Sequence, residues 1–530
     1  MTFNKIRYSL FIGIGIASGL AAIYLFFSYA HIPVNPDAGY YISISEEVLN
    51  GANPVVDVKN MYTPGIYYAY ALWIKLFGSG YATIVLLVYI VNTLNALLLY
   101  LILSEFIQQN ILKIMICLSY YYSIFLLEGT SVELEPFQIF FILSAYILYL
   151  KKMPNILKYA LVGLCLGCSF MFKQYSILVI FGFLIISWLD VGQEEKETAR
   201  MKRISVIAVS AIIPFFAFVL FTKASLVHSL YTFGILGNVG ISYITAEGQG
   251  FIEWGDRIMK SIIVRNWVFF PLIIYLFIIL FRRDYLHYRK DFFLLFVFSC
   301  FPLAIRQYGH YFQLIAPWSY LILGILLKRP VDEFRKDCRN DLFFIVSIFV
   351  CFFIILPVFL YFAPTVFYPA SPSIRRGTLL LSITTFSVIA WGIYHSKYKF
   401  NLDILLIILS TTIFLVTLFL SLKIPFSEMR DEKYVQLKEA EEINKIFPKG
   451  SLVYVIDYPQ LYLTCRFKNP LHDYNFPLGN KAHNLSWEAI DNVIVKKDNS
   501  FISSERLAGL GYSEIKIKST MDIKFFKKTY

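Results

Sequence analysis

Long apolar runs separated by short polar turns fill residues 1–422 of the chain. A helix that spans a membrane needs about 20 mostly apolar residues, because hydrocarbon offers no hydrogen-bond partner to its backbone. By this criterion the pattern predicts about thirteen spans, although 157–189 also fits one long kinked helix instead of two spans. The predicted spans are 8–30, 81–104, 111–127, 136–150, 157–172, 175–189, 204–222, 266–281, 291–305, 311–327, 342–362, 377–394 and 402–422.

The turns between these spans carry Lys and Arg unequally. Basic residues gather in alternate turns, and the positive-inside rule places such turns in the cytoplasm. The N-terminus is then cytoplasmic, whereas 31–80, 223–265 and the tail from 423 are extracytoplasmic. The first apolar run, of about 23 residues, is longer than the hydrophobic part of a signal peptide, which favours an uncleaved first helix. The basic turns lie at 151–152, 196–203, 282–290, 328–339 and 397–399.

The composition agrees with a membrane protein and excludes several other classes. Of the 530 residues, 58% are hydrophobic and 16% charged, and the mean hydropathy is +0.61. A soluble globular chain has roughly 25% charged residues, so the soluble, disordered and collagen-like classes are excluded. The basic cytoplasmic turns account for the net charge of +12, so we expect no nucleic-acid partner. Cys165 and Cys168 lie within an apolar run without a second ligand pair and predict no metal site.

The tail, residues 423–530, has a different pattern. Apolar residues recur at helical spacing in 429–446, and short apolar strands follow. Helices interleaved with strands predict a small α/β domain with about three parallel strands. We therefore divide the chain into a transmembrane domain, 1–422, and an extracytoplasmic α/β domain, 423–530. The predicted strands are 451–457, 493–495 and 512–518.

The first outer loop contains two predicted helices and a carboxylate. Pro36 and Asp37 open a helical pattern, and Pro64 opens a second one with amphipathic spacing. Two helices lying in the interface plane would form a floor on which a lipid headgroup can rest. A partly buried carboxylate there can act as a general base, and Asp37 is the candidate. The alternative is that Asp37 only caps its helix.

The second outer turn is acidic. Glu128, Glu133 and Glu135 lie between two spans with no basic residue nearby in the sequence. Ionisable groups beside a membrane are costly and often mark functional sites. One hypothesis is that Glu135 faces the same cavity as Asp37 and holds an acceptor sugar or a divalent cation. The alternative is a solvated acidic turn.

Cations are few on the outer side. A lipid-linked phosphate needs such partners, because negative charge builds on it as the sugar bond breaks. Arg306 precedes His310 and Tyr311. The main outer cations are Lys59, Lys173, Arg257, Lys260, Arg265 and Arg306. For any one of these cations the alternative is interfacial anchoring.

Taken in order, these segments resemble the polytopic GT-C glycosyltransferases, in the group of bacterial aminoarabinose transferases and protein O-mannosyltransferases. The resemblance implies a mostly α GT-C bundle with interfacial helices in the first outer loop. It also implies transfer of a sugar from a polyprenyl-phosphate carrier to a lipid, glycan or protein acceptor on the extracytoplasmic face. Two positions depart from the pattern: Ala38 replaces a second acid, and Thr63 replaces a phosphate-binding lysine. The matching segments are Asp37–Tyr41, Asn53-Pro54 with Asp57, Tyr62–Tyr68, Glu133–Phe137, and Gly309–Phe312 with Pro317.

The same resemblance implies residue roles. Asp37 activates the acceptor hydroxyl, Glu135 matches the second acidic position, and Asp57 is a further catalytic candidate. His310 and Tyr311 match a late-helix motif near the carrier phosphate. No cofactor is implied, and a divalent cation stays open because no His, Asp or Glu cluster has ligand spacing. The substrate-binding candidates are Tyr40, Tyr41, Lys59, Tyr62, Glu133, Lys173, Arg306, His310 and Tyr311.

Two other classes of polytopic protein fit part of the pattern. A polysaccharide polymerase, a ligase or a flippase for lipid-linked glycans predicts charges within the spans along a translocation path, and such charges are scarce here. A non-enzymatic scaffold whose tail binds a partner predicts that Asp37→Asn leaves the phenotype intact.

Overall fold

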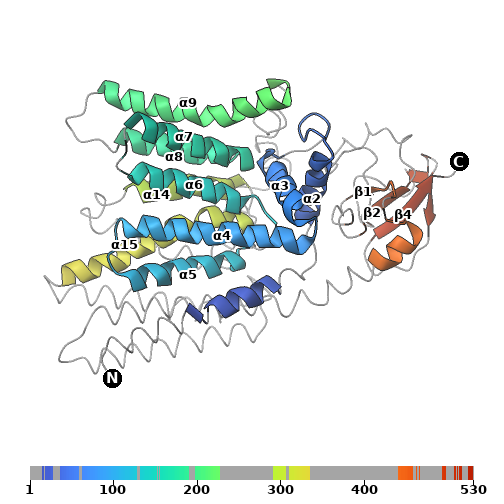
Figure 1. Cartoon of the computed structure of the whole chain (residues 1–530), viewed down its shortest axis with the longest axis horizontal. Helices are drawn as coiled ribbons and strands as arrows, with labels where there is room; N and C mark the ends of the chain where they lie inside the picture. The colour runs from blue at the N-terminus through green and yellow to red at the C-terminus, as the bar shows by residue number, and fades with distance from the viewer. Residues whose placement is uncertain are drawn as a thin grey trace, which may run out of the picture.

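The chain forms a bundle of long helices, with two shorter helices at one end and a small sheet beyond them (Figure 1). These features come from a computed structural model. It describes residues 15–16, 18–27, 36–58, 62–127, 132–151, 153, 155–189, 197–226, 229, 290–305, 309–334, 440–449, 451–456, 461, 465, 492–496, 507–508, 510, 512–515 and 523–528.

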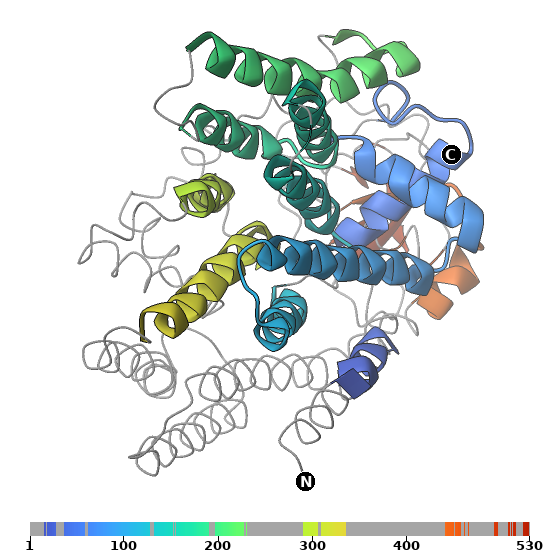
Figure 2. The ribbon, with the colours of Figure 1, turned by 60° about the vertical axis from the view of Figure 1, so that its left-hand side comes forward.

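The bundle helices follow the predicted spans. The stretch 157–189 forms two helices joined by a turn at 173–175, so the alternative of one kinked helix is wrong. Two views show these helices running side by side (Figures 1 and 2). The helices are α4 (Tyr81–Ser104), α5 (Asn110–Leu126), α6 (Glu135–Leu150), α7 (Asn155–Phe172), α8 (Ser176–Leu189), α9 (Glu197–Thr222), α14 (Lys290–Ile305) and α15 (Ala316–Phe334).

Two element boundaries differ from the predicted spans. α9 begins at Glu197 rather than at 204, because its first turns are polar and were assigned to the preceding loop. The span predicted at 311–327 is divided into a short 3-10 helix, η3 (Gly309–Leu314), and α15. Pro317 lies in the first turn of α15, where its fixed φ suits a helix start. The spans predicted at 266–281, 342–362, 377–394 and 402–422 lie outside the described residues.

The surface of the bundle is apolar. Among the described helices, α4 and α9 are long and apolar enough to cross a membrane. Large apolar side chains cover the outward face of α9, and Val209, Leu220 and Phe221 are 63%, 77% and 81% exposed. A continuous apolar face of this kind is typical of contact with lipid.

Two glycines bring α7 and α9 into close contact. A Cβ atom on Gly163 would lie 2.4 Å from the carbonyl oxygen of Ile207, and one on Gly167 would lie 2.2 Å from that of Ala211. Small residues four apart allow this close approach of helix backbones, which is common in membrane proteins. Cys165 lies between these glycines as a free thiol, in agreement with its assignment to a packed apolar helix.

The two short helices lie at the end of the bundle where α4 begins (Figure 1). They are α2 (Pro36–Leu49) and α3 (Gly65–Phe77), and each begins at or directly after a predicted proline. α3 approaches α7 closely, since a Cβ atom on Gly65 would lie 2.5 Å from the carbonyl oxygen of Met171. The prediction of two helices between the first apolar run and α4 is therefore confirmed, and their outer location stays a prediction.

The first part of α2 is buried on all sides. Every residue from Ala38 to Ser45 is buried. Tyr41 of α2 belongs to the same cluster of buried side chains as Ile443 and Phe525 of the tail.

The tail contains a four-stranded sheet of order β1-β2-β4-β3. The prediction of an all-parallel sheet is wrong: β1 and β2 are parallel, but β4 pairs antiparallel with both β2 and β3. The link between β3 and β4 is short, and parallel neighbours need a crossover of a dozen residues or more. The strands are β1 (Tyr454–Ile456), β2 (Asn492–Lys496), β3 (Tyr512–Ile515) and β4 (Ile523–Lys528).

Candidate active site

A buried ion pair lies at the end of the bundle next to α2 and α3. Glu135 is the first residue of α6, where the helix dipole favours a carboxylate. Lys173 follows the last turn of α7, and its Nζ forms an ion pair with Oε1 of Glu135. The side chain of Lys173 is only 4% exposed, and that of Glu135 is 0% exposed. Charges this deeply buried require a partner, and each of the two side chains supplies it to the other.

Aromatic rings surround the ammonium group of Lys173. The Nζ atom lies 4.2 Å from the centre of the Tyr311 ring and 6.0 Å from that of Tyr175. The two rings meet edge to face with their centres 5.6 Å apart. A cation over an aromatic face is attracted by the ring quadrupole. Three residues predicted separately from the sequence, Glu135, Lys173 and Tyr311, are thus brought together by α6, the α7–α8 turn and η3.

Polar side chains support the ion pair from within the bundle. Nε2 of Gln138 donates to Oγ of Ser176 at 2.8 Å, and this hydroxyl is 2.6 Å from Oγ of Ser169. Within the part of the chain that the structure describes, Oε1 of Gln138 and Oε1 of Gln174 are buried and have no hydrogen-bond partner. None of these polar residues was predicted as part of the site from the sequence.

The spacing of the buried polar residues from the two charges is a signal that the sequence does contain. Gln138 follows Glu135 by three positions, and Ser169 precedes Lys173 by four. These spacings place each pair on one helix face. Polar residues on the same face as a charge, inside otherwise apolar helices, indicate a buried polar site.

Four tyrosine rings from α2, α3 and the loop between them pack together. Tyr40 and Tyr41 of α2 contact Tyr62 with ring centres 5.6 and 5.5 Å apart. Tyr67 of α3 completes the group, with its ring centre 6.4 Å from Tyr40 and 6.3 Å from Tyr41. We call Tyr40, Tyr41, Tyr62 and Tyr67 the tyrosine cluster. It contains three of the predicted substrate-binding residues, and Tyr67 is an addition.

The tyrosine cluster lies within the electrostatic influence of two carboxylates. Burial raises the pKa of Tyr41 well above its usual value, and Tyr62, Asp37 and Glu133 raise it further. Burial also raises the pKa of Tyr70, with smaller contributions from Glu133, Tyr81 and Glu135. Glu133 therefore acts electrostatically on both Tyr41 of α2 and Tyr70 of α3. Asp37, in the first turn of α2, is partly exposed, whereas Glu133 is 3% exposed.

Asp57 has a different environment from the other predicted acids. It is exposed, and its Oδ2 accepts a hydrogen bond from the backbone N–H of Asn53 at 2.7 Å. Nδ2 of Asn53 donates to the carbonyl oxygen of Thr222 at 3.0 Å. These contacts fasten the 53–57 turn to the end of α9. The geometry supports a loop-holding role for Asp57, and the catalytic role implied by the resemblance stays a prediction.

The remaining predicted residues lie wholly or partly outside the described structure. Lys59 and Arg306 lie outside the described residues, and only the backbone of His310, within η3, is described. Among the described residues no group of three or more His, Cys, Asp or Glu could hold a metal ion. A divalent cation therefore stays a prediction without an assigned set of ligands.

Comparison with known proteins identifies the fold. No protein-family model and no curated protein matches the chain. The structure of ArnT from Cupriavidus metallidurans bound to undecaprenyl phosphate is similar over 97% of this chain and 98% of that chain, with a TM-score of 0.57 and 13% identity. The chain has the GT-C fold. The apo state of the same protein matches over 99% of this chain and 98% of that chain, with a TM-score of 0.57 and 11% identity.

A lower-scoring match is to an archaeal oligosaccharyltransferase. AglB from Archaeoglobus fulgidus, in complex with an inhibitory peptide and a dolichol-phosphate, has a TM-score of 0.47 and 11% identity. That match covers 94% of this chain and 70% of AglB. The resemblance predicted from the ordered sequence segments is thus confirmed at the level of the GT-C fold by the ArnT structures. The number of spans and the residue roles stay predictions.

Proposed function

We propose that this chain is a multi-pass membrane glycosyltransferase that moves a sugar from a polyprenyl-phosphate carrier to an acceptor hydroxyl on the extracytoplasmic face. The observation that carries this proposal is the buried Lys173 ammonium at the end of the bundle where α2 and α3 lie (Figure 1), since α2 carries the partly exposed carboxylate Asp37. The GT-C fold and the exposed apolar face of α9 support the membrane setting. One neighbour in fold, ArnT, is bound to undecaprenyl phosphate.

Asp37 acts as the general base in this proposal. Its carboxylate is neither fully solvated nor fully buried, so it can accept a proton from an acceptor hydroxyl that enters from the aqueous side. The oxygen of that hydroxyl forms a bond to C1 of the sugar while the bond from C1 to the carrier phosphate oxygen breaks. The proton passes to Asp37, and the negative charge passes to the phosphate.

Lys173 stabilises the leaving phosphate. In the described structure its ammonium is paired with Glu135 and covered by Tyr311. A second anion at this end of the bundle can share the ammonium, and charge-assisted contacts of this kind strengthen as the phosphate gains charge. Glu135 then sets the strength of the interaction by competing for the same cation. The tyrosine cluster forms an aromatic wall against which the sugar can pack.

The test is sugar transfer by an Asp37→Asn variant in cells that lack the native chain. Mass spectrometry of the envelope glycans and lipids identifies the product made by the wild-type protein. Loss of a general base lowers such a reaction by about 10²- to 10⁴-fold, so we expect the product to disappear while the protein remains in the membrane. Glu46→Gln, on the same helix, is the matched control and should retain the product.

Two results would refute the proposal. Wild-type levels of product from Asp37→Asn would exclude it as the base. The absence of any difference in glycans or lipids between cells with and without the chain would instead favour a scaffold.

A further inference from the structure

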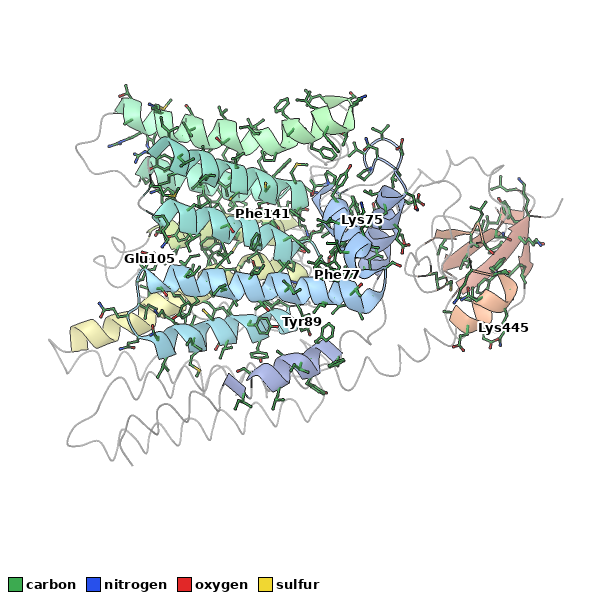
Figure 3. The ribbon with its side chains drawn as sticks, in the orientation of Figure 1. Lys75, Phe77, Tyr89, Glu105, Phe141 and Lys445 are labelled. Carbon is green, nitrogen blue, oxygen red and sulfur yellow. The ribbon has the colours of Figure 1, made fainter. Side chains whose placement is uncertain are left out.

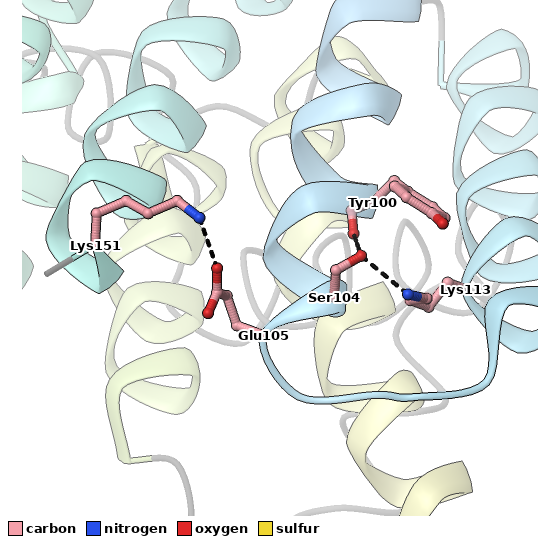
Figure 4. A network of polar contacts seen from close by, with 5 residues as sticks. All are labelled: Tyr100, Ser104, Glu105, Lys113 and Lys151. Atoms are coloured by element: carbon pink, nitrogen blue, oxygen red, sulfur yellow. Dashed lines mark hydrogen bonds and ion pairs between the residues drawn. The ribbon is translucent and has the colours of Figure 1, made fainter.

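Cationic and aromatic side chains also gather at the opposite end of the bundle. Glu105, which marks this end, lies far from Lys75 and Phe77 of α3 (Figure 3). Two of the cations at this end of the bundle contact other side chains of the protein (Figure 4). Lys151 pairs with Glu105 at 2.8 Å, and Nζ of Lys113 donates to Oγ of Ser104 at 3.1 Å. These contacts connect α4, α5 and α6 and are structural.

Three other cations form a separate group where α7 and α9 begin. Nζ of Lys158 lies 5.2 Å from the ring centre of Tyr149 and 5.5 Å from that of Tyr159. The guanidinium carbon of Arg203 lies 5.7 Å from the Tyr159 ring centre, and that of Arg200 lies 5.9 Å from Trp188. We call Lys158, Arg200 and Arg203 the cationic group. All three side chains are partly exposed, so a ligand can reach them.

The close packing of α7 on α9 fixes this group in place. Tyr159 lies one turn before Gly163, and Arg203 lies one turn before Ile207, the residue that Gly163 contacts. The two side chains therefore meet, with Nη1 of Arg203 3.4 Å from the hydroxyl of Tyr159. The amino termini of α7 and α9 also point to this end, and each adds the positive end of a helix dipole.

The surroundings indicate which anion the cationic group binds. Glu197 is the acidic residue that the structure describes on these helix ends, and it is exposed. The Nε atom of Arg200 is buried and donates to no acceptor within the described residues. Exposed apolar side chains lie on the same helix ends, so an anion here would have apolar surface beside it. They are Ile156 and Leu157 on α7, Leu189 on α8 and Met201 on α9.

We infer that the cationic group binds the phosphate of an anionic glycerophospholipid in the cytoplasmic leaflet, with the acyl chains lying along the exposed apolar residues. This inference rests on the membrane placement in the proposed function and on no step of sugar transfer. The aromatic rings hold the three cations in position, and the lipid phosphate supplies the acceptor that the guanidinium of Arg200 needs. The bound lipid would fasten α7 to α9 at the end remote from the candidate active site.

The test measures lipid binding to the purified full-length chain in a zwitterionic detergent. The probe is dioleoyl-phosphatidylglycerol, with dioleoyl-phosphatidylcholine and inorganic phosphate as comparisons, and the readout is the lipid-dependent rise in the thermal midpoint. Each cation near a membrane surface is worth about a five-fold change in affinity, so Arg200→Gln with Arg203→Gln should weaken phosphatidylglycerol binding by about 30-fold. Lys158→Gln should weaken it by about five-fold.

Lys202→Gln is the matched control, because Lys202 is an exposed cation on the same turn of α9 and outside the cationic group. It should bind phosphatidylglycerol as the wild type does. An unchanged affinity in the double variant, or an equal loss in the Lys202 variant, would overturn the inference. Equal stabilisation by phosphatidylcholine or by inorganic phosphate would also overturn it. Asp37→Asn should retain lipid binding, so failure of the transfer mechanism and failure of this inference are distinguishable.

Discussion

The ion pair of Glu135 and Lys173 makes the sharpest prediction about stability, because both side chains are almost fully buried. Lys173→Met leaves a carboxylate without its cation, and Glu135→Gln leaves an ammonium without its anion. Breaking a buried pair from one side costs about 3–5 kcal/mol, whereas replacing both charges is often close to neutral. Lys173→Met also removes the attraction to the Tyr311 ring, worth about 2 kcal/mol at a desolvated site.

The assay is a double-mutant cycle on the purified chain. We expect each single variant to be destabilised by at least about 3 kcal/mol and the double variant, Lys173→Met with Glu135→Gln, to be more stable than either. Thermal midpoints at a fixed scan rate give the order of stability even if unfolding is irreversible. Destabilisations that simply add in the double variant would refute the description of a coupled buried pair.

The same double variant distinguishes the structural role of Lys173 from its proposed role in phosphate binding. It should fold, yet it lacks the cation that we propose for the carrier phosphate, so its binding of undecaprenyl phosphate should be weaker than that of the wild type. Wild-type binding by a folded double variant would remove Lys173 from the phosphate site.

Two further predictions concern packing and orientation. Gly163→Ala should destabilise the chain by about 1–3 kcal/mol, because the added Cβ would lie 2.4 Å from the carbonyl oxygen of Ile207. Gly80→Ala is the control, because an added Cβ there meets no atom so closely, and it should leave the thermal midpoint unchanged. Equal effects of the two substitutions would contradict the α7–α9 packing. A cysteine at the exposed position of Val56 should react with a membrane-impermeant maleimide in intact cells, and one at Lys202 only after permeabilisation. The reverse pattern would invert the proposed topology.

The sequence alone predicted much of the helical framework, because its signals are local. Apolar run length located α4 to α8, and prolines located the starts of α2 and α3. Lys173 interrupts the apolar run 157–189, but the pattern left open whether the run forms two helices or one kinked helix. Such signals depend on neighbours within a few positions, so one sequence is sufficient to detect them.

The contacts between distant segments could not be predicted. Glu135 and Lys173 are 38 positions apart, and nothing local indicates that they pair. Tyr41 of α2 shares a cluster of buried side chains with Ile443 and Phe525, which lie several hundred residues later. β4 was missed because adjacent Phe525 and Phe526 both lie buried, which breaks the alternation expected of a half-exposed strand.

We propose the α2 end of the bundle as the reaction site for a lipid-linked phosphate. The most direct measurement is an experimental structure of this chain with undecaprenyl phosphate bound. We predict that the phosphate lies within hydrogen-bond reach of the Lys173 ammonium, with the Asp37 carboxylate facing the same space. A phosphate bound at the opposite end of the bundle, or an Asp37 side chain turned away from it, would contradict the account.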